Sequence, residues 1–213
     1  MFRPSYHPRL ELIVGPMFSG KSAELVRRAR LAEIAHQRVQ VFRPLTDTRT
    51  PEQAVFSRNG TQVAARTVVG VRELIQSLAD DVEVVGFDEA QFFEADLADA
   101  VQYLLVHGKR IIVAALDLDF ASRPFGAIPS LLALADTVDK LTAVCQRCHS
   151  LFATRTQRLV DGAPATVDSP VVLVDDAPTE QAHVAYEARC IDCYQPPTSG
   201  PWFQPSYWEV TGT

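Results

Sequence analysis

Two kinds of apolar pattern alternate along the first two thirds of the chain. Strands are predicted at residues 10–14, 38–42, 82–87, 110–116 and 137–144, and the apolar run at residues 110–116 is typical of a strand buried on both faces of a parallel sheet. Segments of helical pattern lie between these strands, at residues 23–35, 70–81, 95–107 and 129–135. In the second of them, Val71, Leu74, Ile75 and Leu78 follow the spacing of one helix face. The alternation predicts an α/β fold, a parallel sheet with helices on both faces.

The first predicted helix carries both an apolar side and a cluster of arginines. Its apolar side is expected to include Leu25, Ala29, Ala32 and Ile34. Its arginines, Arg27, Arg28 and Arg30, are expected to form a solvated or subunit-contact face. A nucleic-acid groove normally needs a basic stripe with stacking aromatic residues, so these arginines alone do not indicate one.

The polar stretch at residues 46–67 interrupts the alternation. Asn59-Gly60 within it favours a two-residue hairpin turn, and a loop of this length is usually functional or mobile. Asp47 is a candidate carboxylate for the Mg²⁺ side of a nucleotide site, and Arg49 is a candidate phosphate contact. A salt-bridged turn is the alternative for this pair.

Composition excludes several classes of protein. Of the 213 residues, 47% are hydrophobic and 22% are charged, as in an ordinary globular protein with a sizeable core. The net charge of −6 and the pI near 5.3 provide no basic field for a nucleic-acid backbone. No apolar run approaches the roughly 20 residues of a membrane span, and the first nine residues lack the apolar core of a signal peptide. A cytoplasmic protein without nucleic-acid or membrane partners is therefore expected.

A glycine-rich loop joins the first predicted strand to the first predicted helix. It runs from Gly15 through Gly20 to Lys21 and Ser22, which fits the phosphate-binding signature G-x-x-x-x-G-K-[ST]. Glycines let backbone N–H groups turn toward a phosphate, and the helix adds the positive end of its dipole. Lys21 is expected to bridge the outer phosphates of a nucleoside triphosphate, and Ser22 to offer its hydroxyl to Mg²⁺. The alternative is a chance glycine turn ahead of a helix.

An acidic pair, Asp88 and Glu89, directly follows the run at residues 82–87. In a phosphate-loop enzyme one carboxylate orients Mg²⁺, and the next can take a proton from the attacking group. A surface acidic pair at a strand end is the alternative. Phe120 and its neighbours follow the run at residues 110–116, where ligands bind in open α/β sheets, so they form a plausible substrate wall.

All four cysteines lie in the last third of the chain, as Cys145-Gln-Arg-Cys148 and Cys190-Ile-Asp-Cys193. Two C-x-x-C pairs supply four thiolates for one tetrahedral structural Zn²⁺. Disulfides are the main alternative, but an enzyme that uses ATP belongs in a reducing compartment. A catalytic redox pair would leave the second pair unexplained. The neighbouring His149 is expected to be a loop residue and not a ligand.

The segment between the two cysteine pairs is longer than in a usual zinc ribbon and predicts a carried loop. Residues 154–160 and 165–174 can pair as strands around Asp161-Gly162, which is a hairpin signal. Residues 171–185 are polar at their centre and read as a mobile lid that returns through Tyr186. The expected organisation is a lead-in, an α/β domain, a zinc-ribbon domain with its lid, and an irregular tail, at residues 1–9, 10–144, 145–194 and 195–213.

Taken in order, these motifs resemble those of the zinc-containing thymidine kinases found in bacteria and animal cytosol. The matching segments are residues 15–22, 47–49, 88–93, 114–120, 123–126, 140–148, 154–159 and 186–193. The resemblance implies a P-loop, RecA-like fold and transfer of the γ-phosphoryl group of ATP to the 5′-hydroxyl of thymidine or deoxyuridine. It also implies structural Zn²⁺, Mg²⁺ bound with ATP, a homotetramer, and feedback inhibition by thymidine triphosphate.

The resemblance also assigns roles by matching position. It makes Glu89 the general base, and Ser22, Asp47 and Asp88 the residues on the Mg²⁺ side. The implied ATP-binding residues are Gly15, Pro16, Met17, Phe18, Ser19, Gly20, Lys21, Ser22, Asp88, Glu89, Ala90 and Gln91. The implied thymidine-binding residues are Met17, Phe92, Leu116, Phe120, Thr156 and Tyr186. Lid contacts do not transfer, because this chain carries Val174-Asp175-Asp176-Ala177-Pro178 where relatives are rich in glycine.

A second function remains open at this stage, a RecA-like ATPase that couples hydrolysis to DNA binding through its zinc module. The acidic net charge, the lack of a basic stripe and the small size count against it. A third, a nucleotide-binding protein without catalysis, is disfavoured because Lys21, Ser22, Asp88 and Glu89 are all present.

Overall fold

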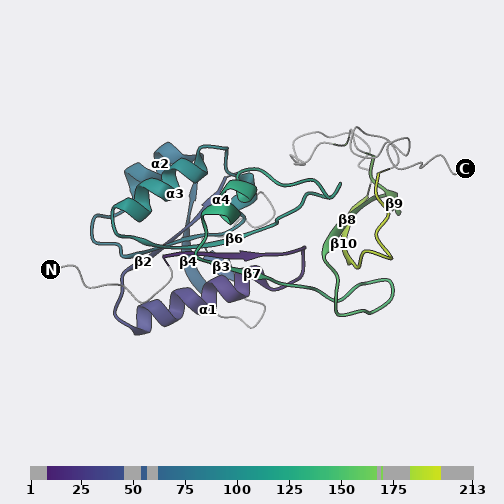
Figure 1. Ribbon diagram of the computed structural model, residues 1–213, viewed down its shortest axis with the longest axis horizontal. Coiled ribbons are helices and arrows are strands. Elements are labelled where there is room, and N and C mark those ends of the chain that lie inside the picture. Colours follow the sequence, from purple (N-terminus) through teal and green to yellow (C-terminus); the bar gives the residue numbers. More distant parts are fainter. Residues whose placement is uncertain (1–8, 46–53, 57–61, 167–168, 170–182, 198–213) are drawn as a thin grey trace, which may run out of the picture.

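The computed structural model describes residues 9–45, 54–56, 62–166, 169 and 183–197 (Figure 1). This part of the chain contains one seven-stranded and one three-stranded sheet. The larger sheet consists of β1 (Leu10–Val14), β2 (Val39–Pro44), β3 (Ala54–Phe56), β4 (Gln62–Val68), β5 (Val84–Phe87), β6 (Arg110–Ala115) and β7 (Thr137–Lys140). The helices are α1 (Lys21–Ile34), α2 (Val71–Ser77), α3 (Leu97–Val106) and α4 (Ile128–Leu134), with a 3₁₀ turn, η1, at Ala90–Phe92.

Strand order in the larger sheet is β3-β4-β2-β5-β6-β1-β7. Every neighbouring pair is parallel except β3 and β4, which are antiparallel. Helix α1 covers one face, and α2, α3 and α4 cover the other (Figure 1). This arrangement confirms the predicted α/β fold. It also places the carboxyl ends of β5, β6 and β1 side by side at one edge of the sheet.

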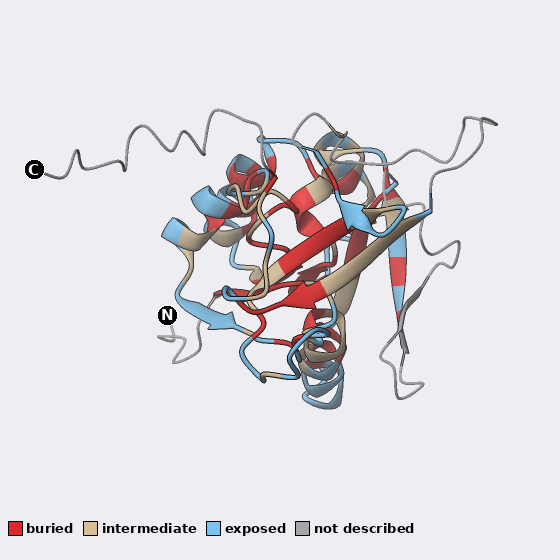
Figure 2. Ribbon diagram, turned by 90° about the vertical axis from the view of Figure 1, so that its right-hand side faces the viewer, coloured by how far each residue is buried: buried red, intermediate tan, exposed pale blue. Residues whose placement is uncertain are grey.

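The two faces of the sheet build two separate cores. In β6, Ile111 and Val113 face the core under α2, α3 and α4, whereas Ile112 faces the core under α1. This alternation is the two-residue period of a strand, and it explains why a strand buried on both faces is apolar throughout (Figure 2). From α1, Leu25 and Val26 are 1% and 2% exposed, and burial of each stabilises the fold by roughly 1.5–3 kcal/mol.

Two expectations for this part of the chain are wrong. Ile34, expected on the buried side of α1, is 73% exposed because nine residues at about 100° each place it on the side of the helix opposite Leu25. The polar stretch at residues 46–67 was expected to be a long loop, but it contributes β3 and β4, with β4 pairing parallel to β2. Asn59-Gly60, Asp47 and Arg49 lie outside the described residues.

The smaller sheet has the order β10-β8-β9 and is antiparallel throughout. Its strands are β8 (Arg155–Val160), β9 (Ala163–Pro164) and β10 (Val184–Arg189). The predicted hairpin turn is confirmed at Asp161-Gly162, where both residues have the positive φ that a type I′ turn requires, 50° and 81°. The strand after it begins at Ala163 and not at Ala165, because a two-residue turn lets pairing resume at once.

Between the two sheets, the chain passes from β7 to the first cysteine pair within a few residues. The predicted boundary between residues 144 and 145 falls in this passage, and the division into domains stays a prediction. Most of the predicted lid and of the C-terminal tail lies outside the described residues, as does the lead-in apart from Arg9.

Candidate active site

The glycine-rich loop after β1 is held in a tight conformation. Gly15 has φ 144°, and a Cβ there would lie 2.4 Å from the carbonyl oxygen of Leu141, so no other residue fits this position. The buried Lys21 donates from Nζ to the carbonyl oxygen of Pro16 at 2.7 Å, and Ser19 donates to the same oxygen at 2.8 Å. Lys21 and Ser19 therefore share one carbonyl oxygen of the loop, and the role of Lys21 toward phosphates stays a prediction.

Ser22 and Asp88 bring the first two motifs together. The Ser22 hydroxyl donates to Asp88 Oδ1 at 3.0 Å, although 66 residues separate them in the chain. Burial, and next the negative charge of Glu89, raise the pKa of Asp88 to about 7, while Ser22 and the charge of Arg43 act in the opposite direction. A cation placed beside Ser22 and Asp88 would favour the ionised carboxylate.

Glu89, the predicted general base, has a left-handed backbone with φ 50°. This conformation is uncommon for a residue with a side chain and costs of order 1–3 kcal/mol, and such residues cluster at functional sites. The Gln91 amide donates to Glu89 Oε2 at 2.5 Å and accepts the backbone N–H of Leu116 at 2.9 Å. The resemblance implies that Gln91 is an ATP-binding residue, which stays a prediction, and its side chain links the ends of β5 and β6.

Gly126 allows the backbone around Gln91 to pack closely. It has φ 51°, and a Cβ at this position would lie 2.6 Å from the Gln91 carbonyl oxygen. Its neighbour Phe125 packs edge to face on Phe92, with ring centroids 5.6 Å apart. Phe92, one of the predicted thymidine-wall residues, is therefore fixed from the loop after β6. The adjacent Phe93 turns into the core, against Phe87.

Phe120 lies in a loop that is braced from two sides. Asp119 accepts the backbone N–H groups of Ala121 and Arg123, each at 2.9 Å, and pairs with the Arg123 side chain at 2.8 Å. The Tyr194 hydroxyl donates to the Phe120 carbonyl oxygen at 2.7 Å. Because Tyr194 directly follows the last cysteine, the second cysteine pair and the predicted nucleoside wall are joined by a hydrogen bond.

Thr156 and Tyr186 approach the α/β domain from the smaller sheet. The Thr156 hydroxyl accepts the backbone N–H of Met17 at 3.0 Å, which places β8 directly on the phosphate loop. The Arg158 guanidinium lies over both the Phe120 ring and the Tyr186 ring. The structure thus brings Met17 into contact with Thr156. It also places the Phe120 and Tyr186 rings beside the same side chain, that of Arg158. The backbone N–H of Leu116 donates to the Gln91 side chain, which follows β5.

The four cysteines form one cluster. Their sulfur atoms all lie within 4.8 Å of one another, and those of Cys148 and Cys190 are 3.6 Å apart. Four sulfurs at about 2.3 Å around a tetrahedral Zn²⁺ would be about 3.8 Å apart, so the set fits this ion. All four are free thiols, which does not support the disulfide alternative. His149 is exposed and does not belong to the cluster, as expected.

The backbone around the cluster prepares it for a cation. Burial raises the pKa of the Cys145 thiol, but hydrogen bonds from the backbone of Cys190, Cys148 and Arg147 outweigh it and lower the pKa to about 6. A thiol that ionises easily is a better metal ligand. The Gln146 side chain also accepts the backbone N–H of Ala188, which ties the first cysteine pair to β10.

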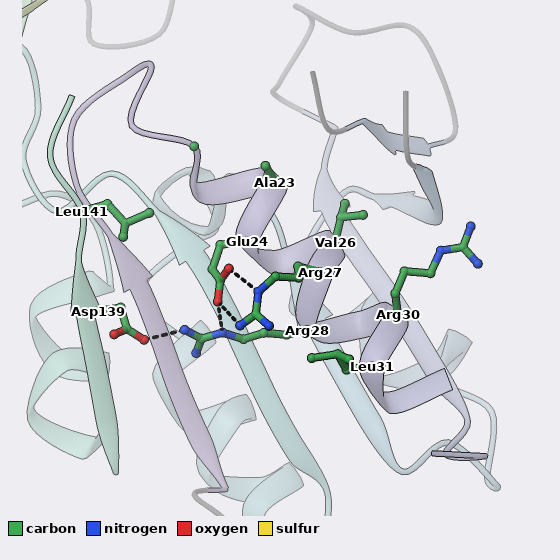
Figure 3. A pocket seen from close by; sticks show the side chains of 10 residues that line it. Ala23, Glu24, Val26, Arg27, Arg28, Arg30, Leu31, Asp139 and Leu141 are labelled. Carbon is green, nitrogen blue, oxygen red and sulfur yellow. Dashed lines mark hydrogen bonds and ion pairs between the residues drawn. The ribbon is translucent and has the colours of Figure 1, made fainter. Parts of the chain in front are cut away.

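A pocket of about 670 Å³ opens between α1 and β7 (Figure 3). Most of its charged lining residues pair with one another, Glu24 with Arg27 and Arg28, and Arg28 with Asp139, whereas Arg30 pairs with Glu33 outside the lining. It contains none of the predicted thymidine-wall residues. Arg28 also pairs with the buried Glu11 at 2.9 Å, so the expectation of a solvated or subunit-contact face is wrong for this arginine.

Sequence reasoning missed Arg43, Arg158 and Tyr194. Arg43 is buried at the end of β2, where its charge reaches Asp88. Arg158 stands in a strand with other polar residues and resembles a surface residue in the sequence. The one signal for Tyr194 was its position directly after Cys193.

Two further findings complete the description of the chain. None of the helices in the described residues is long and apolar enough to cross a membrane. A family model described as thymidine kinase matches residues 8–194, which is most of the chain. The match includes the phosphate loop, the acidic pair and all four cysteines.

Proposed function

Because the chain belongs to the thymidine kinase family, we propose that it transfers the γ-phosphoryl group of ATP to the 5′-hydroxyl of thymidine. The product is thymidine monophosphate, and deoxyuridine is the second expected substrate. One observation supports this most strongly: Ser22 lies 3.0 Å from Asp88, and Glu89, held by Gln91, follows directly. Groups for a triphosphate and a base for a hydroxyl thus share one sheet edge.

On this proposal the loop residues bind and neutralise the triphosphate. Lys21 exchanges its hydrogen bond with the Pro16 carbonyl oxygen for the outer phosphate oxygens, and backbone N–H groups of the loop donate to the same phosphates. Ser22 and Asp88 would hold the Mg²⁺ that arrives with ATP, with Asp47 as a third candidate. Phosphoryl transfer depends mainly on such positioning and charge neutralisation.

Glu89 supplies the base. Its carboxylate takes the proton of the 5′-hydroxyl as the hydroxyl oxygen forms a bond to the γ-phosphorus, and ADP leaves with the electrons of the broken bond. The hydrogen bond from Gln91 holds one oxygen of this carboxylate and so orients the base. The site thereby uses one oriented carboxylate and needs no covalent intermediate.

The aromatic and apolar residues beside this edge form the proposed nucleoside wall. Phe92, Leu116 and Phe120 come from the larger sheet and its loops, and Thr156 and Tyr186 from the smaller one. A flat pyrimidine suits aromatic neighbours, and closure over it excludes water from the transferred group. The proposed Zn²⁺ has a structural role, holding the cysteine pairs that position β8 and β10.

The direct test offers a panel of nucleosides to the purified protein with ATP and Mg²⁺. The expected result is ADP and nucleoside monophosphate in equal amounts with thymidine, less with deoxyuridine, and little with purine nucleosides. ATP hydrolysis that requires DNA and not thymidine would instead support a DNA-dependent ATPase. Inhibition by thymidine triphosphate, a homotetramer and a cytoplasmic location are further parts of the proposal, checked by inhibition kinetics, light scattering and cell fractionation.

A further inference from the structure

Arg158 is a charged residue in an unusual place. It lies on β8 directly opposite Tyr186 on β10, and it is the largest of the fully buried side chains in the described part of the chain. A buried charge is costly unless its surroundings compensate for it. An apolar residue of similar volume would fill this space at a lower desolvation cost, so packing alone does not account for an arginine here.

The surroundings of Arg158 include two aromatic rings from different parts of the fold. Its Cζ atom lies 5.3 Å from the centroid of the Phe120 ring and 6.0 Å from that of the Tyr186 ring. Both distances are within the range of cation–π attraction. Phe120 comes from the loop after β6 and Tyr186 from β10. One guanidinium therefore contacts two rings, one from the side of each sheet.

Strand β8 places Arg158 next to another contact between the sheets. Residues two apart on a strand share a face, so Arg158 lies on the same face as Thr156, whose hydroxyl accepts the Met17 backbone N–H. Gln157, between them, bonds instead with Gln195 on the other side. One face of β8 thus contacts both the phosphate loop and Phe120 of the proposed nucleoside wall.

We propose that Arg158 is a positioning residue that sets the separation of Phe120 and Tyr186, and with it the width of the nucleoside cavity. This inference rests on the proposed function, because it assumes that these two rings bind the nucleoside base. The planar guanidinium attracts both rings while keeping them apart. A methionine would leave the rings free to move toward each other, and a lysine would keep the charge without the planar spacer.

The test compares Arg158→Met and Arg158→Lys with Arg155→Met. Arg155 is on the same strand but on the opposite face, three residues before Arg158, so it is a matched control. For each variant, the KM for thymidine, the KM for ATP, kcat, bound zinc and Tm are measured. Arg158→Met is expected to raise the KM for thymidine by about tenfold, the size of a lost cation–π pair, with the KM for ATP unchanged.

Arg158→Lys is expected to recover part of the loss, and Arg155→Met to behave as wild type. An unchanged KM for thymidine in both Arg158 variants would overturn the inference. Equal rises in both KM values with loss of zinc would also overturn it, since they indicate a merely structural role. If Arg158→Met does not fold, Arg158→Lys decides by the same criterion. Failure of the wild-type protein to phosphorylate thymidine would instead refute the proposed function.

Discussion

Gln91 ties the Glu89 carboxylate to the end of β6. Its Nε2 atom donates to Glu89 Oε2 at 2.5 Å, and its Oε1 atom accepts the backbone N–H of Leu116 at 2.9 Å. Both polar ends of the buried amide are thereby satisfied, and the orientation of Glu89 depends on a neighbouring strand. The position of the proposed base is therefore fixed by the larger sheet and not only by the loop that carries Glu89.

Replacing Gln91 with leucine should lower kcat by about tenfold, because Glu89 loses the group that orients it. The unsatisfied N–H of Leu116 should also lower the free energy of unfolding by about 1–3 kcal/mol. Gln146→Leu is the matched control, since Gln146 makes a similar bond to a backbone N–H, that of Ala188, near the cysteines. Measuring kcat and urea unfolding on the same variant separates the loss of turnover from the loss of stability. Equal loss of kcat in both variants would argue against orientation by Gln91.

Replacing Glu89 with glutamine should leave ATP binding almost intact and lower turnover by roughly 10²- to 10⁴-fold, as expected for loss of a general base. Equilibrium ATP binding and steady-state phosphorylation of thymidine measure the two quantities. Glu94→Gln, five residues later and exposed, serves as a control that removes a charge nearby. Unchanged turnover in Glu89→Gln would remove this residue from the proposed role.

One zinc ion per chain should be found in protein purified under reducing conditions, by elemental analysis. A strong chelator should remove it and lower Tm, because the ion joins the two cysteine pairs that hold β8 and β10. Cys190→Ser should have the same effect without chelator, since it removes one of four ligands. Absence of bound metal, or a Tm that does not respond to the chelator, would contradict the zinc assignment.

Glu24 should make stability depend on acid pH. A hydrogen bond from Arg27, and also one from Arg28, lower its pKa from the ordinary value of 4.5 to about 2. Because the folded pKa is depressed, the stabilisation is present above 4.5 and is lost as pH falls toward 2. Urea unfolding of wild type and Glu24→Gln should therefore show a difference at pH 7 that shrinks between pH 4.5 and 2. A difference that stays constant over this range would contradict the assignment.

The parts of the fold that the sequence predicted well are those determined by local pattern. The run at residues 110–116 is apolar because both of its faces are buried, so its position in a parallel sheet could be predicted from the sequence. Strand β4 could not be predicted in this way, because its exposed positions, such as Ala64 and Arg66, alternate with buried ones in a polar segment. Its place beside β2 depends on pairing with a distant strand.

The candidate site shows the same division. Spacing alone identified the phosphate loop and the cysteine pairs, because their chemistry fixes how many residues separate the ligands. Arg158 could not be found in this way, since its burial depends on Phe120, which lies far away in sequence. Likewise the sequence placed Gln91 in the site but contained no information on its bond to Leu116.

The hydrogen bond between Tyr194 and Phe120 makes the position of the nucleoside wall depend on the backbone beside the second cysteine pair. Cys193 and Tyr194 are neighbours in the chain, so a shift of that thiol's backbone moves the hydroxyl that anchors the loop carrying Phe120. Because the sulfur of the exposed Cys148 lies in the same cluster as that of Cys193, oxidation of Cys148 should also shift this loop. Damage to the cysteine cluster should then weaken nucleoside binding.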